Sequence, residues 1–166
     1  MTKNKPFAFI LYGQPATKKN SSVIVKGHAT LLPSKAYRDY AYSCRKALEV
    51  LKVHEKLQHF SMPVSLKCLY YLKNKAHYPD LIGLLQATSD IISDEYKTIN
   101  NKRVLHTSWV LSDDRIIKNF DGSRIVKSDT NEPKTIVIVT PLNTNLEIET
   151  DPYIIKQLKE QNNLFF

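Results

Sequence analysis

The order of apolar and polar positions predicts strands and helices that follow one another along the chain. Apolar residues alternate with other residues from Val64 to Leu72, which is typical of a strand with one buried face. The run Thr135–Thr140 is β-branched throughout and predicts a second long strand. Shorter apolar runs predict further strands at residues 7–12, 23–26, 104–111, 116–117 and 123–127.

Two segments with apolar residues at helical spacing predict the main helices. Ser34 is expected to cap the first, whose inner positions are Tyr37, Ala41, Cys44, Leu48 and Leu51. The second runs from Asp80 to Ile92 and has inner positions Leu81, Leu84, Leu85, Ile91 and Ile92. Asp151–Pro152 is expected to open a third helix near the C-terminus. The polar stretch 94–103 between these elements is expected to be a loop.

This order, β-β-α-β-α-β-β-β-α, indicates a single α+β domain over residues 1–166. We expect a mixed β-sheet with two main helices packed on it and an extra C-terminal helix. The core is expected at about residues 7–141, with residues 142–166 as a C-terminal extension. No apolar run approaches the roughly 18 residues that a membrane span needs, so we expect no membrane partner. The polar, Lys-bearing N-terminus does not resemble a signal peptide, and a cytoplasmic protein is expected.

Charge is distributed unevenly along the chain. Residues 1–60 carry eleven Lys and Arg against three Asp and Glu, an excess of eight that equals the net charge of the whole protein. Residues 61–166 carry thirteen basic and thirteen acidic residues. An excess confined to the N-terminal third favours a polyanion-binding surface there, and the alternative is a basic solvated face.

The two cysteines are expected to be structural. Cys44 falls on the apolar stripe of a predicted helix and Cys68 on the apolar face of a predicted strand. Their spacing fits neither a metal site nor a redox pair, so both are interpreted as small buried hydrophobes.

Two acidic motifs carry the candidate chemistry. Residues 79–90 read Pro-Asp-Leu-Ile-Gly-Leu-Leu-Gln-Ala-Thr-Ser-Asp, and residues 112–116 read Ser-Asp-Asp-Arg-Ile. Further upstream stand Gly13-x-Pro15, Lys18-Lys19-Asn20 and Ala36-Tyr37-Arg38. In this order, over about residues 7–141, the motifs resemble those of the RusA-type Holliday junction resolvases, as a divergent member of that family.

The resemblance implies a structure-specific endodeoxyribonuclease that resolves four-way DNA junctions in recombination and repair, in a bacterial or prophage setting. It implies a homodimer and a Mg²⁺ or Mn²⁺ cofactor. Asp80 matches the family's first metal-binding Asp, and Asp114 matches another metal ligand with Asp113 beside it. The catalytic set implied in this way is Asp80, Asp113 and Asp114.

The chain departs from the family pattern at three positions of the first motif. Ile82 stands where a second metal-binding Asp belongs, Gly83 replaces an Asn, and Gln86 replaces the catalytic Lys. Ile82 offers no oxygen to a cation, and Gln86 brings no positive charge to a phosphate. Since Ile82 and Gln86 are four residues apart, both changes fall on one helical face. The spacing between Asp90 and Asp113 also suggests an inserted loop near residues 94–106.

Each acidic residue has an alternative structural interpretation. Asp80 stands where a helix N-cap would stand, and Asp113–Asp114 could be an ordinary turn. Ten residues of helix place Asp90 about 15 Å from Asp80, too far to share an ion, so Asp90 is expected to cap or pack the helix. Asp94 and Glu95 would reach the site only if the insertion folds back. His77 could approach a metal or phosphate, or be a solvated loop histidine.

Basic residues near these motifs are candidates for contacts with DNA phosphates. They are Lys18, Lys19, Lys26, Lys35, Arg38, Lys73 and Lys75. Such contacts supply affinity and salt dependence but little sequence preference. The alternative function is a catalytically inactive RusA-like protein that binds branched DNA or a protein partner.

Overall fold

The structure is a computed structural model that describes residues 5–18, 23–24, 31–73, 75–76, 79–142, 152 and 156–157. Its helices are α1 (Lys35–Val53) and α2 (Leu81–Ile92), with a short 3-10 helix η1 (Asp114–Ile116). Its strands are β1 (Phe7–Tyr12), β2 (Val23–Ile24), β3 (Leu31–Leu32), β4 (Val64–Tyr71), β5 (Glu95–Ile99), β6 (Lys102–Thr107), β7 (Ile117–Asn119), β8 (Arg124–Lys127) and β9 (Lys134–Pro141).

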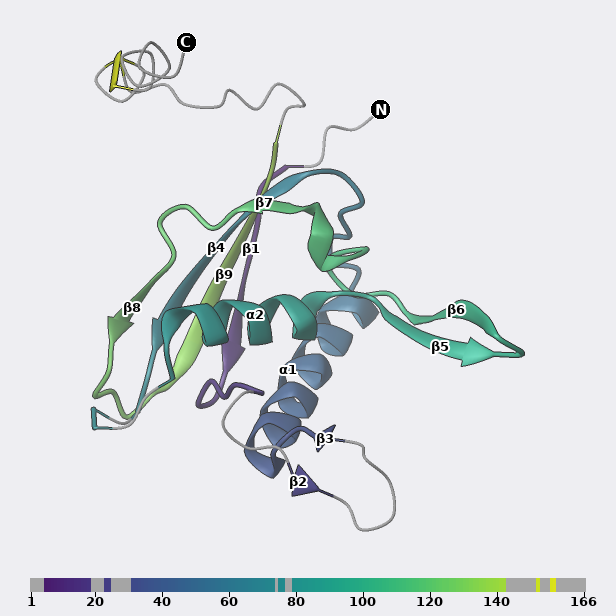
Figure 1. Cartoon of the computed structure of the whole chain (residues 1–166), viewed down its shortest axis with the longest axis horizontal. Coiled ribbons are helices and arrows are strands. Elements are labelled where there is room, and N and C mark those ends of the chain that lie inside the picture. The colour runs from purple at the N-terminus through teal and green to yellow at the C-terminus, as the bar shows by residue number, and fades with distance from the viewer. Residues whose placement is uncertain are drawn as a thin grey trace, which may run out of the picture.

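The main sheet is mixed and is built around β4 (Figure 1). β9 lies between β1 and β4 and is antiparallel to both. The other edge of β4 pairs in parallel with β7 and, further along, with β8. The α+β class, with a mixed sheet and two main helices, is therefore confirmed.

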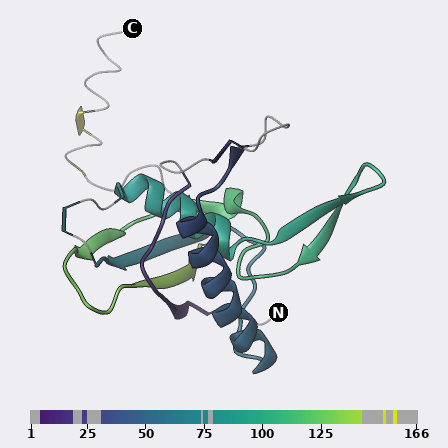
Figure 2. The same ribbon diagram turned by 90° about the horizontal axis from the view of Figure 1, so that it is seen from below.

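Both helices pack on the same face of this sheet, as Figures 1 and 2 show. Tyr70 and Thr135 are register partners on β4 and β9, so their side chains share that face. The Tyr70 hydroxyl bonds Thr88 of α2 at 2.8 Å, and Thr135 bonds Tyr40 of α1 at 3.2 Å. The core between the two layers includes Leu48, Phe60, Leu66, Cys68, Leu84, Ile91 and Leu111, each at most 1% exposed.

The ends of the helices follow their capping residues. The Ser34 side chain accepts a hydrogen bond from the Tyr37 amide at 3.0 Å and begins α1, as predicted. The Asp80 side chain accepts a hydrogen bond from the Gly83 amide and begins α2 in the same way. Alternation along β4 is also as predicted, with a buried residue at every second position.

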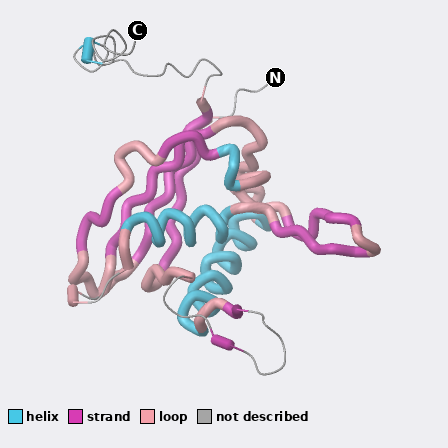
Figure 3. The backbone as a smooth tube through the Cα atoms, viewed as in Figure 1, coloured by secondary structure: helices cyan, strands magenta, loops and turns pink. Residues whose placement is uncertain are grey.

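The predicted loop at residues 94–103 is wrong. β5 and β6 form a two-stranded antiparallel hairpin in its place, and Figure 3 shows it extending away from the body of the molecule. Asn100 and Asn101 form its turn with φ of 50° and 59°, the left-handed conformation that two-residue hairpin turns require. The strand predicted at 104–111 therefore ends at Thr107, and residues 108–112 return to the body of the molecule.

The remaining predictions for the chain have mixed outcomes. The C-terminal helix predicted from Asp151 lies outside the described residues apart from positions 152 and 156–157. The strand predicted at 23–26 is described only at Val23–Ile24, which pair with β3. In the described part of the chain, no helix has the length and apolar character to cross a bilayer.

Candidate functional site

Asp80 is the N-cap of α2. One of its carboxylate oxygens, Oδ1, accepts a hydrogen bond from the Gly83 amide at 2.6 Å. A carboxylate at this position also interacts favourably with the positive end of the helix dipole. The capping role considered for Asp80 is thus present, and it leaves the second oxygen, Oδ2, as the one available to another ligand.

Asp114 and the exposed face of α2 line one groove. The α2 residues in the groove are Ile82, Leu85, Gln86 and Ser89, and opposite them lie Asp114, Ile117 and Phe120. Ile82 is 72% exposed, unusually high for a large apolar side chain on a helix that packs on a sheet. Positions 82 and 86 share one face of α2, as their spacing predicted, and this face lines the same groove as Asp114.

The neighbouring acids Asp113 and Asp114 have opposite environments. Asp113 accepts hydrogen bonds from the Arg115 amide and guanidinium at 2.8–3.1 Å, and these bonds hold the pKa of Asp113 well below its usual range. Burial, then the hydrogen bond with Asp113, and then the charges of Asp113 and Asp90 raise the pKa of Asp114. Asp113 thus caps η1 and is neutralised locally, whereas Asp114 carries the carboxylate that a cation would stabilise most.

Lys18 reaches α2 from the segment that follows β1. Its ammonium forms an ion pair with Asp90 at 2.6 Å and lies 5.4 Å from the centre of the Tyr37 ring. Partial burial lowers the pKa of Lys18, but the interactions of Lys18 with Asp90 and Tyr37 together outweigh this effect, and the pKa is raised overall. Lys18 also lines a small crevice with Gln86. Asp90 is therefore neither a cap nor a buried packing residue but the partner of a cation.

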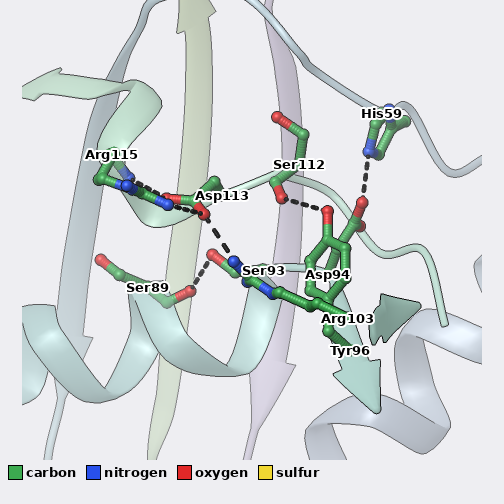
Figure 4. Close-up of polar contacts among 9 residues, drawn as sticks. All are labelled: His59, Ser89, Ser93, Asp94, Tyr96, Arg103, Ser112, Asp113 and Arg115. Carbon is green, nitrogen blue, oxygen red and sulfur yellow. Dashed lines mark hydrogen bonds and ion pairs between the residues drawn. The ribbon is translucent and has the colours of Figure 1, made fainter. Parts of the chain in front are cut away.

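Asp94 and Glu95 do not fold back to the candidate site. Asp94 accepts from the Trp109 amide at 2.7 Å and lies 3.1 Å from His59 (Figure 4). Glu95 pairs with Arg45 at 2.6 Å and accepts from the Trp109 indole at 3.2 Å. Both acids instead fix the base of the β5–β6 hairpin to the body.

The basic candidates are distributed over several surfaces. Lys35, Arg38, Lys73 and Lys75 are exposed, which suits a phosphate contact, although Lys35 also pairs with Asp39 at 2.5 Å. Lys19, Lys26 and His77 lie outside the described residues. The two cysteines are buried as predicted, and burial raises the pKa of Cys44 to about 11 and that of Cys68 to about 12.

The groove offers few oxygen ligands, so it could hold a divalent cation only weakly. In the described part of the chain, no three His, Cys, Asp or Glu side chains come together as a metal site. Mg²⁺ is commonly held by one or two carboxylates, with water and substrate phosphates completing its shell. Asp114 is the carboxylate among the residues that line the groove and would hold the ion, which would supply electrostatic stabilisation of the phosphate, whereas Asp80 is not among those residues.

Comparisons with known proteins add no further assignment. No protein-family model matches the chain, and no curated protein matches its sequence.

Two functional features were missed at the level of sequence. The pairing of Lys18 with Asp90 joins residues 72 positions apart, and no local pattern announces it. The hairpin could have been found from Asn100–Asn101, because two adjacent residues that tolerate positive φ, directly after β-branched Thr98 and Ile99, are typical of a tight turn.

Proposed function

We propose that the protein is a structure-specific endodeoxyribonuclease of the RusA type that acts on four-way DNA junctions with Mg²⁺. Its metal site has fewer carboxylate ligands than the family pattern. The observation that carries the proposal is the groove shared by Asp114 and by the α2 face bearing positions 82 and 86. The two acidic motifs lie some thirty residues apart in the sequence. The hairpin between the two motifs extends away from the body, and residues of both motifs still line the same groove.

In this proposal the metal is held by two carboxylates, from Asp80 and Asp114, and by the substrate's own phosphate oxygens. Exposed cations position the DNA backbone, and the strongest candidates are Lys35, Arg38, Lys73 and Lys75. The protein acts as a homodimer, so that both strands of a symmetric junction are reached. With an apolar residue at 82 and no cation at 86, we expect slow cleavage.

A nicking assay on a synthetic four-way junction with Mg²⁺ or Mn²⁺ tests the proposal. We expect slow, symmetric nicking that is lost in Asp114→Asn. The double variant Ile82→Asp with Gln86→Lys should accelerate it by on the order of 10²-fold, the scale at which one electrostatic contact influences a transition state. Absence of nicking by both proteins would refute the proposal.

A matched variant controls for the added charges. Val50 and Val53 are exposed residues of α1, at 57% and 75%. Val50→Asp with Val53→Lys introduces the same two charges away from the groove and should leave the nicking rate unchanged. Equal acceleration by this variant would show that the gain at positions 82 and 86 is not local.

A second function, binding of branched DNA without cleavage, is favoured by the apolar lining of the groove. Ile82, Leu85, Ile117 and Phe120 surround the carboxylate of Asp114 and offer no oxygen to a cation. Junction binding in a gel-shift assay, together with no nicking by the native protein and restored nicking by the double variant, would favour this function.

A further inference from the structure

The β5–β6 hairpin, hereafter the arm (residues 95–107), has the form and charge of a DNA-contacting element. It leaves the body beside α1 and α2 and extends into solvent, as Figures 1 and 2 show. Its strands pair only with each other among the described residues. Five residues of strand correspond to a reach of about 17 Å, and a two-stranded ribbon fits the width of the DNA major groove, about 12 Å.

Beyond Glu95 at its base, the arm carries charge of one sign. Lys97, Lys102 and Arg103 are its cations, and residues 96–106 contain no Asp or Glu. In the described part of the chain, neither Lys97 nor Lys102 forms an ion pair. Two cations without a protein counter-charge, held on an extended element, are electrostatically complementary to a polyphosphate backbone.

Strand register divides the arm into two faces. One face carries the pairs Lys97–Val104 and Ile99–Lys102, and the other carries Tyr96–Leu105 and Thr98–Arg103. Val104 and Ile99 are 43% and 55% exposed, so the two lysines lie beside uncovered apolar side chains. A face of this composition offers ammonium groups to phosphates and methyl groups to sugars and base edges.

The other face turns back to the candidate site. The Arg103 guanidinium lies over the Tyr96 ring at 4.0 Å and its Nη2 atom is 4.0 Å from the Asp113 carboxylate. The Tyr96 hydroxyl donates to the Ser112 carbonyl at 3.4 Å, and Figure 4 shows both contacts. The arm is therefore joined, through Arg103 and Tyr96, to the segment Ser112–Asp113 that directly precedes Asp114. DNA with a phosphate at Asp114 would have the arm alongside it.

We propose that the arm binds a duplex branch of the DNA that the groove acts on, with Lys97 and Lys102 as its phosphate contacts. The inference rests on the proposed function for the identity of the ligand. Pairing of the arm with a second copy fits less well, since edge-to-edge pairing would bring Lys102 and Arg103 of one copy close to those of the other.

The test measures how salt affects binding of the full-length protein to a labelled four-way junction and to a linear duplex, without divalent cations. Lys97→Gln with Lys102→Gln removes two cations from the arm. If both contact phosphates, the slope of log K against log salt falls by about 1.8, which is roughly 60-fold in affinity at 0.1 M relative to 1 M salt. The matched control is Arg124→Gln with Lys127→Gln, which removes two exposed cations from β8, on the other side of the molecule in Figure 1.

The outcomes separate the two proposals. If the unaltered protein binds neither DNA, the proposed function fails and the arm inference fails with it. If it binds the junction but the arm and β8 variants bind alike, with equal salt slopes, only the arm inference fails. In that case the lysines serve to keep the edges of the hairpin from pairing with other chains.

A second measurement does not depend on weakened binding. Val104 is replaced by the photo-crosslinker p-benzoylphenylalanine, and the complex with the junction is irradiated. We expect covalent attachment to DNA at the arm and none from the same replacement at Val126 of β8, which is 42% exposed. Attachment of Val104 to a second copy of the protein in place of DNA would overturn the proposal.

Discussion

Two substitutions at Asp80 separate its role as a helix cap from its proposed role as a metal ligand. Asp80→Ala removes the acceptor of the Gly83 amide and the charge together. Asp80→Asn retains an acceptor oxygen and removes only the charge. Because Asn and Asp are about equally good N-caps, we expect Asp80→Asn to leave the fold nearly unchanged while abolishing the metal site.

The magnitude follows from the surroundings of the Gly83 amide. Loss of an N-cap costs about 1 kcal/mol, and a buried amide without a partner costs about 1–3 kcal/mol. Gly83 is buried, and both figures describe the same lost hydrogen bond, so they overlap. We therefore expect Asp80→Ala to lose about 1–2 kcal/mol of unfolding free energy, at about 2–4 °C of Tm per kcal/mol for a domain of this size.

Thermal unfolding followed by circular dichroism, and junction nicking with Mg²⁺, are measured on the same preparations. Ser34→Ala is the matched control, since it removes the equivalent cap of α1 and should lower Tm without altering nicking. A loss of stability in Asp80→Asn equal to that in Asp80→Ala would refute the capping argument. Native nicking by Asp80→Asn would refute the metal role.

Three further outcomes are expected. Tyr70→Phe and Thr88→Val should each cost about 1–3 kcal/mol in urea unfolding, because each leaves one buried hydroxyl unpaired, and the double variant should cost less than their sum. Asp114→Asn should stabilise the protein at pH 7 and lose this advantage below about pH 4. The raised pKa means that the folded state disfavours the charged carboxylate, which is absent at low pH. Cys44 and Cys68, with pKa values raised to about 11 and about 12, should react with a thiol reagent at pH 8 only after unfolding.

Elements with one buried face were predicted from the periodicity of the sequence, whereas β5 and the first residues of β6, which have no buried face, were predicted as a loop. β4, β9, α1 and α2 each place every second or every third to fourth side chain in the core, so their periodicity is visible in the order of residues. In β6, by contrast, every residue from Lys102 to His106 is exposed. Because none of these side chains is buried, apolar residues do not recur there with a strand period. The composition of the segment is therefore that of a loop.

The candidate site divides along similar lines. The cap at Asp80 and the shared face of Ile82 and Gln86 depend on neighbours within one helix, and both were predictable from spacing. The position of Asp114 in the groove, and the bonds that hold Asp113 away from it, depend on how the chain returns after the arm. The course of the chain after the arm is a tertiary property that no local sequence pattern encodes. The resemblance could therefore match the two acidic motifs to the family pattern, but it could not place Asp113 and Asp114 relative to α2.

Neighbouring residues occupy the surroundings of two positions, 83 and 86, at which the sequence departs from the RusA-type pattern that it resembles. A Cβ atom at Gly83 would lie 3.1 Å from the Asp80 carboxylate and 3.2 Å from a Thr17 methyl group, so Thr17 occupies space that a larger residue at 83 would need. Lys18, next in sequence, lines the same small crevice as Gln86, and its ammonium pairs with Asp90. A positive charge therefore remains near position 86, but it comes from another segment and is held by an acid. A lysine restored at 86 would meet this charge, and the gain in nicking from restoring the motif should be larger when Lys18 is neutralised as well.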